Sequence, residues 1–202
     1  MKQTKIVITG GPSGGKTTLI EGLKKELGPQ VAVVPEAASI LYRGGFPRLK
    51  SRSSPLFTQR SIFFVQRELE GLVATENTKA PLIVCDRGSL DGIAYWPRSG
   101  THFFKTLGTS EKGELRRYDW VIHLDTASPD FYDTTNPLRT ESYREASALN
   151  DRVKSAWQKH PRRFIITQNS DFISKMTLSL AVIRAILEGW SEKQIRLELL
   201  SS

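Results

Sequence analysis

The sequence predicts an α/β fold, a three-layer α/β/α sandwich built on a five-stranded parallel sheet. Five short segments rich in β-branched and aliphatic residues recur along the chain, and amphipathic helical patterns separate them. A glycine-rich turn joins the first of these segments to the first helical pattern. Continuous apolar runs are typical of parallel strands covered on both faces. Strands that alternate with helices imply right-handed crossovers and hence a parallel sheet.

The predicted strands are the runs KIVIT, VAVV, PLIVC, WVIHL and RFIIT, at residues 5–9, 31–34, 81–85, 120–124 and 163–167. Between and after them, apolar residues recur at spacings of three and four, which predicts helices over 17–27, 57–76, 143–160 and 172–188. The third helix opens with the capping-box pattern Ser142-x-x-Glu145. The polar stretches 43–55 and 125–140 are predicted loops, and the terminal WSEKQIRLELLSS a short amphipathic helix.

Length and composition favour one globular domain over residues 1–202. No apolar run approaches the ~20 residues of a membrane span, and the first residues lack a signal peptide's layout. We therefore expect a cytoplasmic location. Cys85 is the only cysteine, which rules out an intrachain disulfide and argues against a cysteine-based zinc site.

The formal net charge of +8 is unevenly distributed. Residues 37–67 contain no Asp or Glu. The same interval contains six basic residues: Arg43, Arg48, Lys50, Arg52, Arg60 and Arg67. Two interpretations fit this pattern. The segment is either a solvated basic face or a site for an anion such as an acidic substrate, a phosphoinositide headgroup or nucleic acid.

The glycine-rich turn fits the complete Walker A pattern, Gly10-x-x-x-x-Gly15-Lys16-Thr17, with a predicted strand before it and a helix after it. Backbone N–H groups of such a loop turn inward, and the helix N-terminus adds partial positive charge. Lys16 is expected to reach the β- and γ-phosphates and the Thr17 hydroxyl to ligate Mg²⁺. The predicted nucleotide-binding residues are Gly10, Gly11, Pro12, Ser13, Gly14, Gly15, Lys16, Thr17 and Thr18.

Acidic residues follow the second and third predicted strands. The carboxyl ends of parallel strands point at the ligand crevice, so Asp86 in VCDRGSLDG is expected near the Walker loop as a Mg²⁺ ligand. The adjacent Arg87 is expected to bind the substrate. Glu36 in VVPEAAS is placed to accept a proton from a substrate hydroxyl or to ligate the metal. The alternatives are a strand-end turn for Asp86 and an ordinary helix N-terminal glutamate for Glu36.

Two arginines follow the fourth strand. Arg139 and Arg144, in NPLRTESYREA, belong to a predicted mobile lid over about 126–145 and are expected to stabilise charge on the transferring phosphoryl group. Surface ion pairs with Glu141 and Glu145 are the alternative.

A predicted acceptor-binding region covers about 36–67. Within it Arg43 is expected to bind an anionic acceptor, and Gln66 to face an acceptor base or amide. A purely structural role in the core, beside Phe63 and Phe64, is the alternative for Gln66.

Taken together, GGPSGGKTTL, PEAAS, CDRGSLDG and LRTESYREA resemble the AAA-type ATPase/kinase-like P-loop family. This family includes the ribosylnicotinamide kinase half of a bacterial NAD-synthesis regulator and a eukaryotic GTP- and phosphoinositide-binding trafficking protein. The chain is more distantly similar to deoxynucleoside and thymidylate kinases, which also carry a carboxylate after strand two and an acidic-Arg pair after strand three. The resemblance covers about residues 5 to 185 and implies nucleotide-dependent phosphoryl transfer or nucleotide-switched binding. Signatures of ring-forming ATPases are not evident, so a hexameric motor is not expected.

Two functions follow as hypotheses. The first is a kinase that uses ATP or GTP with Mg²⁺ and transfers the γ-phosphate to a small hydroxyl-bearing or phosphorylated acceptor of the nucleoside, nucleotide or pyridine riboside type. The second is a GTP- or ATP-binding switch that recognises an anionic lipid at a membrane surface or a protein partner. Nucleic acid is not expected as a partner, because no nucleic-acid-binding motif accompanies the charge.

Overall fold

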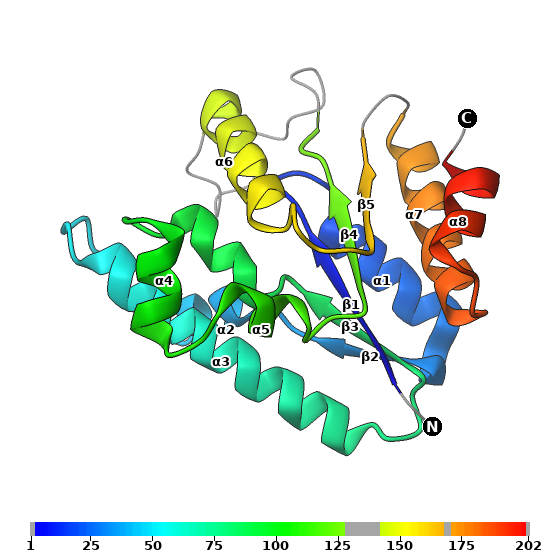
Figure 1. The fold of residues 1–202 in the computed structure, drawn as a ribbon, viewed down its shortest axis with the longest axis horizontal. Helices are drawn as coiled ribbons and strands as arrows, with labels where there is room; N and C mark the ends of the chain where they lie inside the picture. The colour runs from blue at the N-terminus through cyan, green and yellow to red at the C-terminus, as the bar shows by residue number, and fades with distance from the viewer. Residues whose placement is uncertain (1–2, 128–141, 168–170, 201–202) are drawn as a thin grey trace.

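A computed structural model describes residues 3–127, 142–167 and 171–200 of the chain. One five-stranded sheet forms its centre, with strand order β2-β3-β1-β4-β5 and every neighbouring pair parallel (Figure 1). The strands are β1 (Thr4–Thr9), β2 (Val31–Val34), β3 (Leu82–Asp86), β4 (Trp120–Leu124) and β5 (Arg163–Ile166). The predicted fold class is therefore confirmed.

Alternate residues of the buried strands pack into two separate hydrophobic cores, one on each face of the sheet. On β1, Ile6 and Ile8 pack against α1 (Lys16–Leu27), α7 (Phe172–Leu187) and α8 (Glu192–Leu199), whereas Val7 belongs to the opposite core. That second core receives α3 (Ser54–Glu76), the 3-10 segment η2 (Ser89–Tyr95) and α6 (Tyr143–Ala156). The period-two alternation of side chains along a strand thus produces the three layers.

The remaining elements are short: η1 (Gly28–Gln30), α2 (Ala37–Arg43), α4 (Gly100–Leu107) and α5 (Glu111–Leu115). No helix in the described ranges is long and apolar enough to cross a membrane.

Several short elements were absent from the sequence prediction. The helices α4 and α5 begin after the caps Ser99 and Ser110, whose side chains accept from the N–H groups of His102 and Gly113. Such caps satisfy otherwise unpaired donors, and this signal marks both helices in the sequence.

α3 starts at Ser54, three residues before the predicted start, because Pro55 lies in its first turn, where a missing N–H costs nothing.

A buried carboxylate ties α3 to the sheet. Glu70 is fully buried, and its Oε1 accepts from the Tyr118 hydroxyl at 2.7 Å while its Oε2 accepts from Arg117 at 2.7 Å and from Lys5 at 3.3 Å. Lys5 belongs to β1, and the other two donors directly precede β4. The side chain therefore joins three segments that are distant in sequence.

Removing this charge is expected to destabilise the fold. Glu70→Gln removes the fully buried carboxylate that pairs with the half-buried Lys5 and Arg117, and breaking a buried ion pair costs about 3–5 kcal/mol. Glu21→Gln is the matched control, because Glu21 pairs with Lys24 at 2.9 Å on the exposed face of α1, and such pairs contribute about 0–1 kcal/mol. Chemical denaturation measures both free energies of unfolding. Equal losses in the two variants would contradict the structural role given to Glu70.

Candidate functional site

The Walker loop connects the carboxyl end of β1 to α1 at the central strand of the sheet. Gly10 has φ +128°, and a Cβ there would lie 2.0 Å from the Leu124 carbonyl oxygen. Gly15, the residue before α1, has φ +89°, and its Cβ would lie 2.8 Å from Met176 Cε. Both positions require glycine for conformation and for space. The loop thus closes tightly over β4 and α7, and the first N–H groups of α1 remain available to an anion.

Lys16 folds back over this loop. Its Nζ donates to the carbonyl oxygens of Gly11 at 2.7 Å and Gly10 at 3.2 Å. Desolvation in the site, followed by the nearby Arg87 charge, lowers the pKa of Lys16 to about 7. The ammonium group is held where phosphate would arrive, in surroundings that supply too little negative charge to keep it fully protonated.

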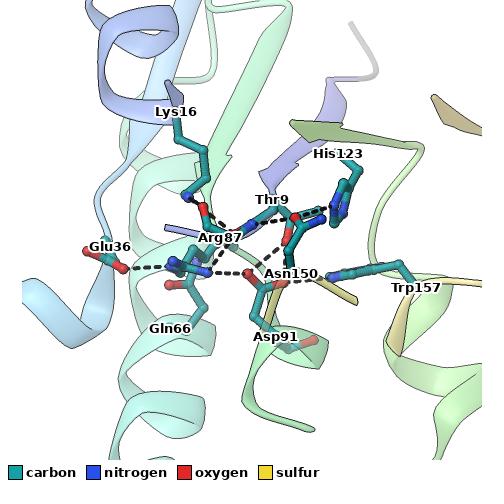
Figure 2. A network of polar contacts seen from close by, with 12 residues as sticks. Thr9, Lys16, Glu36, Gln66, Arg87, Asp91, His123, Asn150 and Trp157 are labelled. Carbon is teal, nitrogen blue, oxygen red and sulfur yellow. Dashed lines mark hydrogen bonds and ion pairs between the residues drawn. The ribbon is translucent and has the colours of Figure 1, made fainter. Parts of the chain in front are cut away.

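Glu36 and Arg87 form an ion pair beside the loop (Figure 2). Glu36 follows β2 and is the N-terminal flanking residue of α2. One of its oxygens accepts from Arg87 Nε at 2.7 Å, and the other accepts from the Ser39 hydroxyl. Burial by itself would raise the pKa of Glu36, but Arg87 and the Ser39 hydrogen bond outweigh it, so the pKa lies below its ordinary value. Glu36 is therefore ionised at neutral pH.

Asp86 ends β3, paired in register with Ile8 of β1. Burial, followed by the Glu36 charge, raises the pKa of Asp86 to about 6. Within the described ranges, no hydrogen bond to the Asp86 carboxylate is observed. It is thus a half-buried carboxylate next to Lys16 with unused acceptor capacity.

This environment fits Mg²⁺. The Asp86 carboxylate and the Thr17 hydroxyl are the hard oxygen donors that this ion prefers, and the exposed Thr17 lies in the first turn of α1. The described residues contain no cluster of three or more His, Cys, Asp or Glu side chains able to hold a metal. Mg²⁺ is commonly bound by one or two carboxylates together with substrate phosphates and waters, so a protein cage is not required.

Asp91 holds Arg87 from below, a role that the sequence analysis did not predict. Its carboxylate accepts from Arg87 Nη1 at 3.1 Å, from the Thr9 hydroxyl at 2.8 Å and from Trp157 Nε1 at 2.7 Å (Figure 2). Arg87 itself has φ +69°, an uncommon backbone conformation for a residue with a side chain. The sequence does contain a signal for this contact, because a second carboxylate follows Arg87 by four residues in DRGSLD.

The other predicted site residues lie in different environments. Gln66 is buried on α3, and its Nε2 donates to the Arg87 carbonyl oxygen at 3.2 Å and to Glu70 at 3.3 Å, so its amide contacts the backbone of the site. Arg43 and Arg144 are exposed, on the last turn of α2 and the first turn of α6. Arg139 and most of the predicted lid, residues 128–141, lie outside the described residues.

Two open hollows occur at the opposite edge of the sheet. One, of about 970 Å³, lies between the first residues of β1 and β4 and the α7–α8 corner, and its lining includes Trp190 and Lys193. The other, of about 650 Å³, lies beside α5 and includes Lys159. Neither hollow includes a Walker-loop residue, and in α/β sheets ligands bind at the carboxyl ends of the strands. The candidate site is therefore the Walker loop with Glu36, Asp86 and Arg87.

Comparison with solved structures supports the fold that carries this site. Deoxyadenosine kinase from M. mycoides with bound dATP superposes with a TM-score of 0.60 and 14% identity, covering 90% of this chain and 100% of that chain. Thymidylate kinase from Ehrlichia chaffeensis gives a TM-score of 0.60 and 17% identity, covering 93% and 100%. Thymidylate kinase from Candida albicans gives 0.59 and 17%, covering 93% of each chain. At this level of identity the likeness establishes the fold alone.

Among curated proteins, no sequence matches the chain significantly. The model of the AAA_28 family, described as an AAA domain, matches residues 5–174 and so spans the Walker loop and all five strands. The resemblance found in the motifs is confirmed by this match. With its P-loop, its parallel sheet and a family match over most of its length, the chain belongs to the AAA_28 family of AAA domains and has the fold of P-loop kinases.

Proposed function

We propose that the protein is a Mg²⁺-dependent kinase that transfers the γ-phosphate of ATP or GTP to a hydroxyl-bearing or phosphorylated small molecule. The observation that carries this proposal is the chain of contacts from Glu36 through Arg87 to the Walker loop. Arg87 Nε donates to Glu36 at 2.7 Å, and Arg87 Nη1 donates to the Gly10 carbonyl oxygen at 3.3 Å. Nucleotide binding alone requires no carboxylate at this position. A kinase requires one to orient the acceptor hydroxyl.

Each residue has a distinct role in the proposed reaction. Lys16 and the N–H groups of the Walker loop bind the β- and γ-phosphates. Glu36 orients the acceptor hydroxyl and takes its proton as the new bond forms between that oxygen and the γ-phosphorus and the bond from the γ-phosphorus to the bridging oxygen breaks. Arg87 neutralises charge between the two substrates. Mg²⁺, held by Thr17 and Asp86, would neutralise charge on the phosphate oxygens.

The class of acceptor is inferred from the structural neighbours. The three neighbours are kinases of deoxyadenosine or thymidylate, a nucleoside and a nucleotide. Their similarity covers at least 90% of this chain. We therefore propose an acceptor of the nucleoside or nucleotide type, bound beside α2 and α3, and the resemblance of the motifs adds a pyridine riboside to these candidates.

A second candidate function has one specific observation in its favour. The end of α2 and the connection to α3 expose the basic residues Arg43, Arg48, Lys50 and Arg52. Apolar Leu49 in that connection and Phe57 in the first turn of α3 are also exposed, at 64% and 57%. Basic and apolar side chains that occur together on a surface suit an anionic lipid surface or an acidic protein. In this alternative the nucleotide switches the affinity for that partner, and no phosphate is transferred.

A phosphate-transfer screen separates these functions. Purified protein is incubated with ATP or GTP, Mg²⁺ and a panel of nucleosides, nucleotides and pyridine ribosides, and phosphorylated product is detected by mass spectrometry against a sample without acceptor. Lys16→Ala is the negative control, because it removes the cation expected to bind the β- and γ-phosphates. Tight nucleotide binding without transfer to any acceptor, together with nucleotide-dependent binding to anionic vesicles, would favour the second candidate.

Nucleotide binding is expected to take up a proton above pH 7. The pKa of Lys16 is about 7 in the nucleotide-free site, and phosphate oxygens favour the ammonium form. Affinity should therefore be insensitive to this group well below pH 7 and should fall by up to about tenfold per pH unit above it. Calorimetry at pH 8 in two buffers of different ionisation enthalpy should give an uptake of about one proton. The exposed Lys24→Met variant should behave like the wild type, and binding without proton uptake would refute the assignment.

Glu36→Gln is expected to lower kcat by about 10²–10⁴-fold, the usual contribution of general-base catalysis. The amide oxygen can still accept from Arg87, so nucleotide affinity should stay within a few fold. Steady-state kinetics with the best acceptor, alongside nucleotide titration, measures both quantities. Turnover at the wild-type rate would show that Glu36 is not the base.

Asp86→Asn is expected to raise the Mg²⁺ concentration required for turnover, and excess Mg²⁺ should restore part of the rate. In the wild type, protonation of Asp86 below its pKa of about 6 should weaken Mg²⁺ binding in the same way. Mg²⁺ titrations of the rate at pH 5.5 and pH 7.5 measure this dependence. If the variant and the wild type share one Mg²⁺ dependence at both pH values, Asp86 does not hold the metal.

A further inference from the structure

The peptide group between Gly10 and Gly11 is held from both of its ends. Its carbonyl oxygen, on Gly10, accepts from Lys16 Nζ at 3.2 Å and from Arg87 Nη1 at 3.3 Å. Its N–H, on Gly11, donates to Asn150 Oδ1 at 2.9 Å. One peptide group thus connects the cation expected to bind phosphate, the arginine beside Glu36, and a side chain of α6.

The Asn150 amide has only one orientation that satisfies its neighbours. The Gly11 N–H can only donate, so the amide atom facing it must be the oxygen. His123 Nε2 lies 3.0 Å from the same oxygen (Figure 2). Asn150 Nδ2 donates to Asp125 Oδ1 at 2.8 Å. Asp125 also pairs with Lys154 at 2.8 Å.

The Asp125 carboxylate is fixed as an acceptor. Burial by itself would raise its pKa, but hydrogen bonds from His123, Asn150 and Lys154 outweigh it and hold the pKa well below its ordinary range. An ionised carboxylate only accepts hydrogen bonds. The atom of Asn150 that faces it must therefore be the nitrogen, which agrees with the orientation required by Gly11.

The backbone at this point needs such a constraint. Gly10 has φ +128°, in a region open to glycine, and glycines allow a peptide group to rotate with little steric resistance. A rotated Gly10–Gly11 peptide would aim its N–H at Lys16 and Arg87 and its carbonyl at Asn150 Oδ1. Gly11 is buried, so an N–H without an acceptor would also carry the cost of an unmade hydrogen bond.

We infer that Asn150 is a positioning residue that fixes the Gly10–Gly11 peptide. The Gly10 carbonyl can then hold Lys16 at the proposed phosphate site and Arg87 beside Glu36. A Walker loop ordered in advance does not have to be ordered when the nucleotide arrives, and such preorganisation increases affinity. This inference rests on the nucleotide binding proposed above. Asn150 itself touches neither substrate in this scheme.

Hydrogen exchange of the Gly11 amide tests the anchor without nucleotide. In the wild type this amide should be protected, and in Asn150→Ala it should exchange at least about tenfold faster, while the amides of Ile6 and Ile8 in β1 keep their relative protection. Exchange of the wild-type Gly11 amide at the rate of an exposed loop would overturn the inference, whether or not the variant folds.

Nucleotide affinity tests the consequence. Asn150→Ala should raise the Kd for Mg-ATP or Mg-GTP about tenfold, the effect of losing one buried hydrogen bond. Leu149→Ala is the matched control, since Leu149 is the preceding residue of α6 and is buried in the core beside Val153 and Trp157. It should lower the melting temperature but keep Kd within twofold.

Two outcomes of that titration contradict the inference. An unchanged Kd in Asn150→Ala would show that the anchor does not matter for nucleotide, and an equal rise in Leu149→Ala would show that any destabilisation of α6 has the same effect. A wild-type protein that binds neither nucleotide would refute the proposed function instead. In that case the exchange of the Gly11 amide still decides whether Asn150 anchors the loop.

Discussion

The site depends on where the Arg87 guanidinium is held. It contacts Glu36 on one side, Asp91 on the other and the Gly10 carbonyl oxygen above, so three segments distant in sequence converge on one cation. Burial by itself would lower the pKa of Arg87, but interactions with Tyr95 and with the carboxylates of Glu36, Asp91 and Asp86 raise it well above its ordinary value. A partly buried cation that cannot lose its proton must keep its partners. Arg87 thereby fixes the distance between the Walker loop and the carboxylate after β2.

The sheet brings these segments together through its strand order. β1 lies between β3 and β4, and β2 lies beside β3. In a parallel sheet every strand delivers its carboxyl end to the same edge. The Walker loop, the Asp86–Arg87 pair and Glu36 therefore follow neighbouring strands in the order β1, β3 and β2. Trp157 and Asn150 approach the same edge from the α6 layer, through Asp91 and Gly11.

Burial shifts two charged groups of the site toward neutrality. The pKa of Lys16 is lowered to about 7 and that of Asp86 is raised to about 6, in both cases chiefly by desolvation. An ammonium group without phosphate and a carboxylate without a cation both lack the opposite charge that would stabilise them. The arrangement is one that phosphates and a divalent cation would complete, and displaced pKa values of this kind are common at functional sites.

The sequence alone determined the fold class, because strands of a parallel sheet are short continuous apolar runs and their helices carry a regular apolar face. It also determined the Walker loop, since a phosphate-binding turn needs glycines and a lysine at fixed spacing within one local segment. It placed Glu36 and Asp86 at the carboxyl ends of their strands. The roles of Asp91 and Asn150 came from the tertiary structure, as did the hydrogen bonds that Gln66 makes to Arg87 and Glu70. Asp91 meets Thr9 and Trp157 across 82 and 66 residues, and Asn150 meets Gly11 across 139. Such hydrogen bonds leave no periodic or local pattern, because their partners become neighbours only when the sheet and both helical layers have packed.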